Sequence, residues 1–120
     1  MDSSGWLAFF ADEPNAQHFA LPLEKTDQLL VPSITLTEVF KRILQQAAEA
    51  AALEAVAQMR RGRVVELDAR IAVEAATLGH AHGLPLANSI IYATGRLHRA
   101  LIWTQDGDFE SLEGVKYFRK

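Results

Sequence analysis

Hydrophobic and polar positions along the chain follow two periods, one typical of amphipathic helices and one typical of short buried strands. The clearest helical pattern comes after Pro32, where apolar residues recur at i, i+3, i+4, i+7 and i+8 between Leu36 and Leu44. The alanine-rich stretch Gln46–Ala57 is also expected to be helical, because alanine has the highest helix propensity. This helix is expected to end at Arg60-Arg61-Gly62, where cations are followed by glycine.

Short apolar runs between the helical patterns predict strands. These runs are Leu29–Val31, Arg63–Leu67, Ala100–Thr104 and Val115–Phe118. Further helices are expected near Trp6–Phe10, after Pro14, after Asp68 and from Pro85 onward. Strands that alternate with helices favour a parallel sheet covered on both faces, so the expected fold class is α/β. The length predicts a single domain over residues 1–120.

Composition narrows the possible functions. The 120 residues include no cysteine, which excludes a disulfide scaffold, a cysteine-ligated metal and a cysteine nucleophile. No apolar run approaches the ~20 residues of a membrane span, and the first residues lack a basic signal-peptide region, so a cytoplasmic protein without membrane contact is expected. The net charge of −3 neither requires nor excludes a nucleic-acid partner.

Acidic residues distant in sequence follow the expected strands or open the helices after them. Asp2 precedes the first helix, Glu38 lies near the start of a helix, and Asp106 and Asp108 come just after Ala100–Thr104. Functional groups of parallel α/β sheets collect at the carboxyl ends of strands. Clustered carboxylates repel one another unless they take up protons or share a cation. Mg²⁺ or Mn²⁺ prefers such oxygen ligands, and the site suits metal-assisted phosphodiester hydrolysis.

Each acid also has a purely structural interpretation. Asp2 can be an ordinary helix N-cap, and Thr35-x-x-Glu38 fits a capping box. Asp106-Gly107 is compatible with simple turn chemistry, and capping explains Asp68 fully. Only the set as a whole supports a functional site.

Four segments together resemble the PIN-domain family, and within it the VapC-type toxins of bacterial toxin–antitoxin pairs. They are Asp2–Leu7, Thr35–Val39, Leu84–Thr94 and Thr104–Phe109, in family order over nearly the whole chain. The resemblance implies a three-layer Rossmann-like fold with a central parallel sheet. It also implies an endoribonuclease that hydrolyses RNA of the tRNA or rRNA class with water activated by Mg²⁺ or Mn²⁺. A VapB-type antitoxin that blocks the site and a homodimer are further implications.

The resemblance also implies a set of site residues. The implied catalytic and metal-binding positions are Asp2, Glu38, Asn88, Asp106 and Asp108, with Ser4 and Thr104 as supporting polar side chains.

Asn88 departs from the family pattern, which has an acid there. Asparagine can offer one oxygen to a metal, but it is neutral and adds N–H donors. Three explanations are open: an engineered replacement of aspartate, a natural departure in a weakly active or inactive member, and an unrelated helix cap. The alternative function is therefore a catalytically impaired domain that only binds antitoxin or RNA. We expect Asn88→Asp to raise Mn²⁺-dependent RNA cleavage.

The start of the chain is the second departure. Family members carry an apolar central strand before the first acid, whereas only Met1 precedes Asp2 here. The expectation is a sheet whose first strand is truncated, or supplied by other residues or a partner, with two strand edges exposed.

Three other features have more than one interpretation. Arg96 and Arg99 near a helix end can contact an RNA backbone or simply favour the helix dipole. Any aromatic side chain near the first helix that stays exposed would form a groove for an antitoxin helix. A phospho-acceptor signalling domain using Asp68, Thr104 and Lys116 is a third possible function, but no acidic pair follows the first strand and no closing helix follows Phe118.

Overall fold

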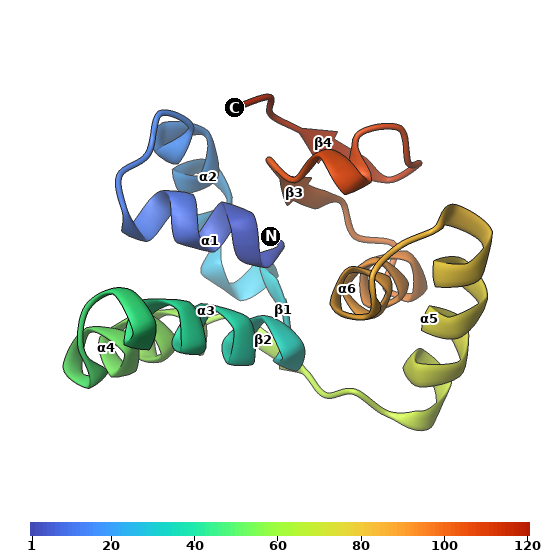
Figure 1. Cartoon of the computed structure of the whole chain (residues 1–120), viewed down its shortest axis with the longest axis horizontal. Helices are drawn as coiled ribbons and strands as arrows, with labels where there is room; N and C mark the ends of the chain where they lie inside the picture. The colour runs from blue at the N-terminus through green and yellow to red at the C-terminus, as the bar shows by residue number, and fades with distance from the viewer.

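The computed structural model describes residues 1–120 and confirms the alternation of helices and short strands (Figure 1). In chain order the elements are α1 (Ser3–Phe10), α2 (Ala16–Leu23), β1 (Leu30–Pro32), α3 (Ser33–Gln46), α4 (Glu49–Met59), β2 (Arg63–Val65), α5 (Ala69–His82), α6 (Leu86–Leu97), β3 (Ile102–Thr104) and β4 (Val115–Tyr117). Two 3₁₀ turns, Thr26–Gln28 and Gly107–Phe109, precede β1 and follow β3. No helix combines the length and the apolar character needed to cross a bilayer.

The strands form two separate parallel pairs, where a single central sheet was expected. Val31 of β1 lies opposite Val64 of β2, and Trp103 of β3 lies opposite Lys116 of β4. Each of the four strands therefore has one edge without a neighbouring strand. A groove of about 790 Å³ lies between the pairs, lined by residues of both strands and by Met1.

Helices cover the strands on both sides, which gives three layers. Helices α1 to α4 lie on one side of the strands and α5 and α6 on the other (Figure 1). The largest core cluster joins α1, α2, β1 and α4, with Trp6, Phe19, Val31 and Met59 fully buried. Each apolar side chain of this kind contributes roughly 1.5–3 kcal/mol by leaving water.

The alanine-rich stretch is not one continuous helix. Ala47, with φ −135° and ψ −101°, ends α3, and the chain reverses before α4 begins at Glu49. The reversal lets Ala52 and Ala55 of α4 be buried, since a continuous helix would carry them away from the core. Tertiary packing therefore overrides the helix propensity of the alanines.

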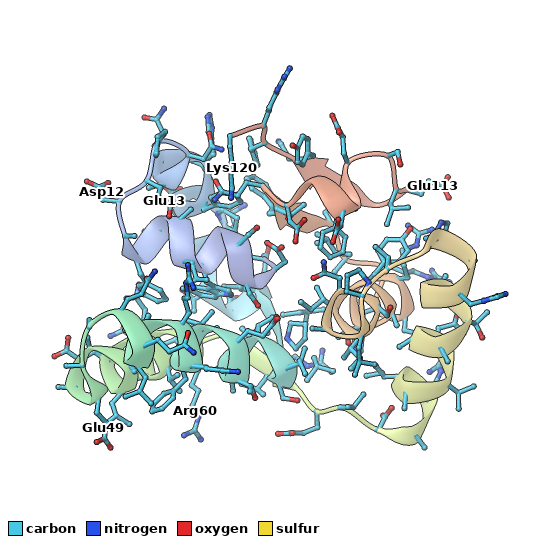
Figure 2. All side chains as sticks on the ribbon, in the orientation of Figure 1. Asp12, Glu13, Glu49, Arg60, Glu113 and Lys120 are labelled. Carbon is cyan, nitrogen blue, oxygen red and sulfur yellow. The ribbon has the colours of Figure 1, made fainter.

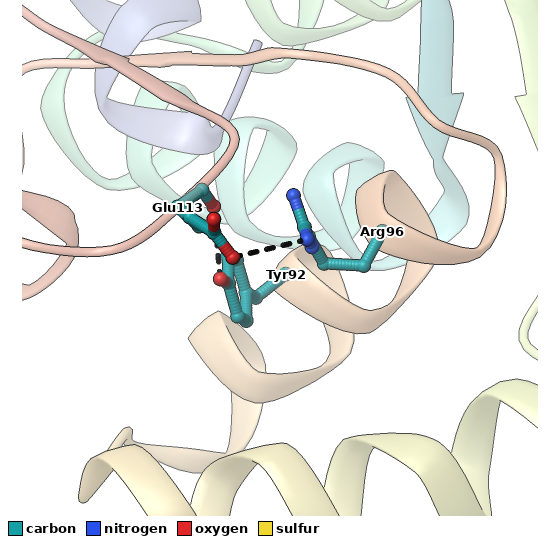
Figure 3. Close-up of polar contacts among 3 residues, drawn as sticks. All are labelled: Tyr92, Arg96 and Glu113. Atoms are coloured by element: carbon teal, nitrogen blue, oxygen red, sulfur yellow. Dashed lines mark hydrogen bonds and ion pairs between the residues drawn. The ribbon is translucent and has the colours of Figure 1, made fainter.

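Helix α6 fixes the loop between β3 and β4. The Tyr92 hydroxyl donates a hydrogen bond to the Glu113 carbonyl oxygen (2.8 Å), and the Arg96 guanidinium lies 3.6 Å from the Glu113 carboxylate (Figure 3). Gly114, at φ +77°, lies directly against the Arg96 side chain, so a Cβ there would be both strained and obstructed. Phe109 is fully buried in the same region. Helix α6 thus holds the loop that carries Asp106.

Candidate active site

Asp2 is buried where α1 meets the end of β3. It caps α1, because its Oδ1 atom accepts a hydrogen bond from the Gly5 backbone N–H (3.0 Å). The Ser4 hydroxyl donates to Oδ1 (2.8 Å), and the Thr104 hydroxyl donates to Oδ2 (2.8 Å). The capping interpretation of Asp2 is therefore correct.

Thr104 joins Asp2 to the loop that carries Asp106. Its Oγ1 atom donates to Asp2 and accepts from the Asp106 backbone N–H (2.9 Å). Ser4 makes a parallel link, because its Oγ atom accepts from the Gln105 backbone N–H (3.2 Å). Two segments about a hundred residues apart are thus locked together by hydroxyl groups.

Burial shapes the electrostatics at this end of the chain. Burial raises the pKa of Asp2 above its ordinary value, and the hydrogen bonds from Ser4, Thr104 and Gly5 partly oppose the rise. Burial also lowers the pKa of the Met1 amino group, which the neighbouring Asp2 partly offsets. The fold therefore disfavours charge on both groups, and a nearby cation would favour ionised Asp2.

Glu38 faces α1 from the second turn of α3. Its Oε1 atom accepts a hydrogen bond from the Ser3 hydroxyl (2.5 Å). The capping-box interpretation is wrong, because Thr35 donates instead to the Pro32 carbonyl oxygen (2.7 Å) and α3 has no side-chain cap. The sequence patterns do not single out Ser3 as a site residue, although it directly follows Asp2.

Asn88 lies in the first turn of α6 and contacts both acids of the β3–β4 loop. Its Nδ2 atom donates to Oδ2 of Asp106 and to Oδ2 of Asp108, each at 3.2 Å. The Asp106 Oδ1 atom accepts from the Asp108 backbone N–H (2.9 Å), so the expected turn chemistry is also present. Asn88 is not a cap, because no side chain caps α6.

The site residues chosen from the sequence lie on neighbouring segments. Ser3 and Ser4 connect them, one to Glu38 and the other to Asp2 and Thr104. No three His, Asp or Glu side chains converge closely enough to hold a metal ion by themselves. The donor chemistry nevertheless fits a hard dication, because the groups are carboxylate oxygens and one amide oxygen, without sulfur or imidazole. Among them, Oε2 of Glu38 and Oδ1 of Asp108 carry no hydrogen bond.

Arg96 and Arg99 lie away from this cluster. Arg96 is eight residues beyond Asn88 on α6, which is about 12 Å along a helix axis. Arg96 pairs with Glu113, and Arg99 lines the groove between the two strand pairs. An RNA-backbone contact by these arginines stays a prediction, and they do not border the carboxylates.

The residues of the phospho-acceptor alternative do not meet. Asp68 caps α5 by accepting from the Ile71 backbone N–H (2.9 Å), as expected. The Lys116 ammonium lies over the Trp103 ring, 4.7 Å from its centroid. Neither side chain joins Thr104, so this alternative has no site.

Comparison with known families and structures gives a consistent result. A family model described as PIN domain matches residues 1–115. No curated protein matches the sequence.

Several solved structures share the fold over nearly their whole length. A toxin–antitoxin complex from Klebsiella pneumoniae has a TM-score of 0.81 at 24% identity, covering 99% of this chain and 97% of the other. VapC20 of Mycobacterium tuberculosis, a toxin that cleaves the sarcin–ricin loop, has a TM-score of 0.78 at 20% identity (95% and 94%). DNA-bound VapBC from Salmonella typhimurium has a TM-score of 0.75 at 16% identity (98% and 94%). The expected α/β fold class is therefore confirmed.

Proposed function

The chain belongs to the PIN-domain family, and on that premise we propose that it is a metal-dependent endoribonuclease, the toxin of a toxin–antitoxin pair. The observation that carries the proposal is the hydroxyl network that joins Asp2 to Asp106, with Glu38 and Asp108 beside it. The substrate class we propose is structured RNA such as tRNA or rRNA. VapC20, which shares the fold, cleaves the sarcin–ricin loop.

Asp106 and Asp108 would hold a Mg²⁺ or Mn²⁺ ion together with water and substrate phosphate, with the Asn88 amide oxygen and the Glu38 carboxylate beside it. When bound, such an ion supplies an acidified water and neutralises charge on the phosphodiester oxygens. Asp2 has both carboxylate oxygens engaged by Ser4, Gly5 and Thr104, so its main task is to fix the Asp106 backbone through Thr104. To offer its oxygen to the ion, the Asn88 side-chain amide would have to flip, because its Nδ2 atom faces Asp106 and Asp108.

A second candidate function has its own observation in support. The Asn88 amide bridges Asp106 and Asp108 by hydrogen bonds, which lowers their need for a cation. A domain in this state would bind RNA or antitoxin without cleaving.

Metal-dependent cleavage separates the two candidates. The purified chain is incubated with deacylated tRNA and with a sarcin–ricin-loop oligonucleotide, in Mn²⁺ or in EDTA, beside Asn88→Asp and Asn88→Ala. The ribonuclease proposal expects cleavage that needs Mn²⁺, is stronger in Asn88→Asp and is lost in Glu38→Gln. No cleavage by the unchanged chain together with cleavage by Asn88→Asp supports the impaired domain. No cleavage by either chain contradicts the ribonuclease proposal.

We also propose an antitoxin partner. A groove of about 560 Å³ runs from Ser4 between α1, α3 and α4, and apolar side chains such as Leu7, Phe10 and Ile43 line it. An apolar groove of this kind accepts an amphipathic helix. An Arg or Lys of the same partner would enter the carboxylate cluster, which attracts a forked cation.

The partner proposal is tested by co-expression with any small protein that is encoded next to this chain in its genome. Co-purification is expected, and Glu38→Gln and Ile43→Asp should weaken it. Absence of association contradicts the proposal. Light scattering on the purified chain would test the expected homodimer.

A further inference from the structure

A polar pocket of about 500 Å³ opens beside the carboxylate cluster. We call it the C-terminal pocket, and its walls include Ser4, Asp106, Tyr117, Arg119 and Lys120. The pocket therefore shares Ser4 and Asp106 with the candidate active site. The other three residues, Tyr117, Arg119 and Lys120, lie at the end of β4 and after it. None of these three takes part in the carboxylate network.

The cations of the C-terminal pocket are not used by the fold. Arg119 and Lys120 are exposed and make no ion pair, since the single ion pair of the molecule joins Arg96 and Glu113. Tyr117 is half-buried, and its hydroxyl has no hydrogen-bond partner in the protein. A tyrosine side chain and two unpaired cations therefore border the same polar space.

The segment that carries these residues is fixed. The Asn15 side-chain amide donates to the carbonyl oxygens of Phe118 (3.4 Å) and Arg119 (3.1 Å), and to Oε1 of Gln105 (3.2 Å). The Phe118 backbone N–H donates to the Thr104 carbonyl oxygen (2.9 Å). Tyr117 and Arg119 are thereby held beside Gln105, the residue that precedes Asp106 in the chain.

Lys120 extends this arrangement toward a second groove. Lys120 and Glu13, which lies in the connection between α1 and α2, both line the groove between α1, α3 and α4 (Figure 2). Lys120 therefore borders both the C-terminal pocket and this groove. The C-terminal pocket itself has one hydrophobic residue among its seven, which does not favour an apolar protein segment.

We propose that the C-terminal pocket binds the nucleotide next to the cleaved phosphodiester of an RNA strand. The base lies against the Tyr117 ring, because every base has a face that stacks on aromatic side chains. The flanking phosphates contact Arg119 and Lys120. These two cations offset the negative charge of the acids in the candidate active site, which are Asp2, Glu38, Asp106 and Asp108. The inference rests on the proposed ribonuclease function and names a substrate-binding subsite of the same site.

The test measures RNA binding without cleavage. Fluorescence anisotropy of a fluorescein-labelled oligoadenylate is recorded in EDTA at several salt concentrations. Arg119→Gln and Lys120→Gln should each weaken binding and reduce the slope of log Kd against log salt by about 0.7, the value for one phosphate contact on a single strand. Tyr117→Leu should weaken binding roughly tenfold, whereas Tyr117→Phe, which keeps the ring, should bind like the unchanged chain.

Lys116→Gln is the matched control, because it removes one positive charge from β4 on the side that packs against Trp103. If Lys116→Gln and Arg119→Gln change binding equally, bulk charge explains the effect and the proposal is overturned. It is also overturned if Arg119→Gln and Lys120→Gln impair capture of the antitoxin but leave RNA binding intact.

The same variants separate this inference from the proposed function. Selective loss of RNA binding, in a chain that never cleaves RNA with Mn²⁺, would support the C-terminal pocket and contradict the ribonuclease. If the chain cleaves RNA with Mn²⁺ but Tyr117→Leu, Arg119→Gln and Lys120→Gln all bind RNA as the unchanged chain does, the ribonuclease function is supported and the C-terminal pocket is contradicted.

Discussion

The side-chain amide of Asn88 bridges the carboxylates of Asp106 and Asp108, with both N···O distances at 3.2 Å. Two acids that would otherwise repel each other therefore share one neutral donor. The bridge ties the loop after β3 to the first turn of α6. It also means that residue 88 controls both the charge and the hydrogen bonding of the cluster.

Replacing Asn88 by aspartate should couple stability to metal. A third carboxylate in place of the donor introduces repulsion, so in EDTA the free energy of unfolding should fall by about 1–3 kcal/mol. Mn²⁺ should restore it, because a ligand that binds only the folded state stabilises that state. Thermal unfolding with and without Mn²⁺ measures the effect. Asn88→Ala, which removes the bridge without adding charge, should gain less from Mn²⁺, and an equal gain would contradict the charge argument.

Asp2→Asn should stabilise the metal-free fold, increasingly so as the pH rises. The folded-state pKa of Asp2 lies above the ordinary value of 3.8, so the fold favours the protonated carboxyl. Its stabilising contribution is fully present below pH 3.8 and is lost as the pH rises through the raised pKa. A neutral amide avoids that loss, and the hydroxyls of Ser4 and Thr104 can reverse their donor roles. Urea unfolding in EDTA should show a gain of about 1 kcal/mol near neutral pH that shrinks in acid. A gain independent of pH would contradict this explanation.

Removing the Thr104 hydroxyl should damage both stability and the site. Thr104→Val leaves the Asp106 backbone N–H without a partner and removes one of the two hydroxyls that donate to Oδ2 of Asp2, at a cost of about 1–3 kcal/mol. Cleavage should fall with it, because Asp106 is no longer fixed. Thr104→Ser restores the hydroxyl and should recover most of both losses. Denaturant unfolding and a cleavage assay on the two variants test this, and equal behaviour of Val and Ser would disprove a role for the hydroxyl.

Gly95 should be sensitive to a single added methyl group. A Cβ at Gly95 would lie 2.8 Å from Cγ1 of Ile102, so α6 could not stay as close to β3. We expect Gly95→Ala to lower the free energy of unfolding by about 1–3 kcal/mol, despite the better helix propensity of alanine. Gly107→Ala is the control, since nothing lies within 4 Å of a Cβ there. Thermal unfolding of the two variants should separate them clearly.

Much of the fold could be predicted from the sequence, because periodicity reports which faces are buried. The helix after Pro32 and the four strands lie where the pattern indicates, although each strand has only three residues. The break at Ala47 could not be predicted, because alanine favours helix on both sides and only packing decides where the chain reverses.

The candidate site was predictable in location and less so in detail. The rule that functional groups follow strand ends selected Asp106, and applied to β4 it would also have selected Arg119. Side-chain rotamers decide the rest. The Thr35 hydroxyl donates to the Pro32 carbonyl oxygen instead of capping α3, and the Ser3 hydroxyl donates to Glu38. Residue spacing alone does not predict either hydrogen bond.

The division of the sheet has a consequence for how the site is assembled. Asp2 and Glu38 belong to the half of the molecule built from α1 to α4, whereas Asn88, Asp106 and Asp108 belong to the half built on α6 and β3. The groove between β1 and β3 separates these halves, and the Asp2 N–H to Trp103 carbonyl bond (3.1 Å) crosses between them. The carboxylates of the candidate site therefore come from both halves, so a change in how one half packs against the other would alter the distances between these carboxylates.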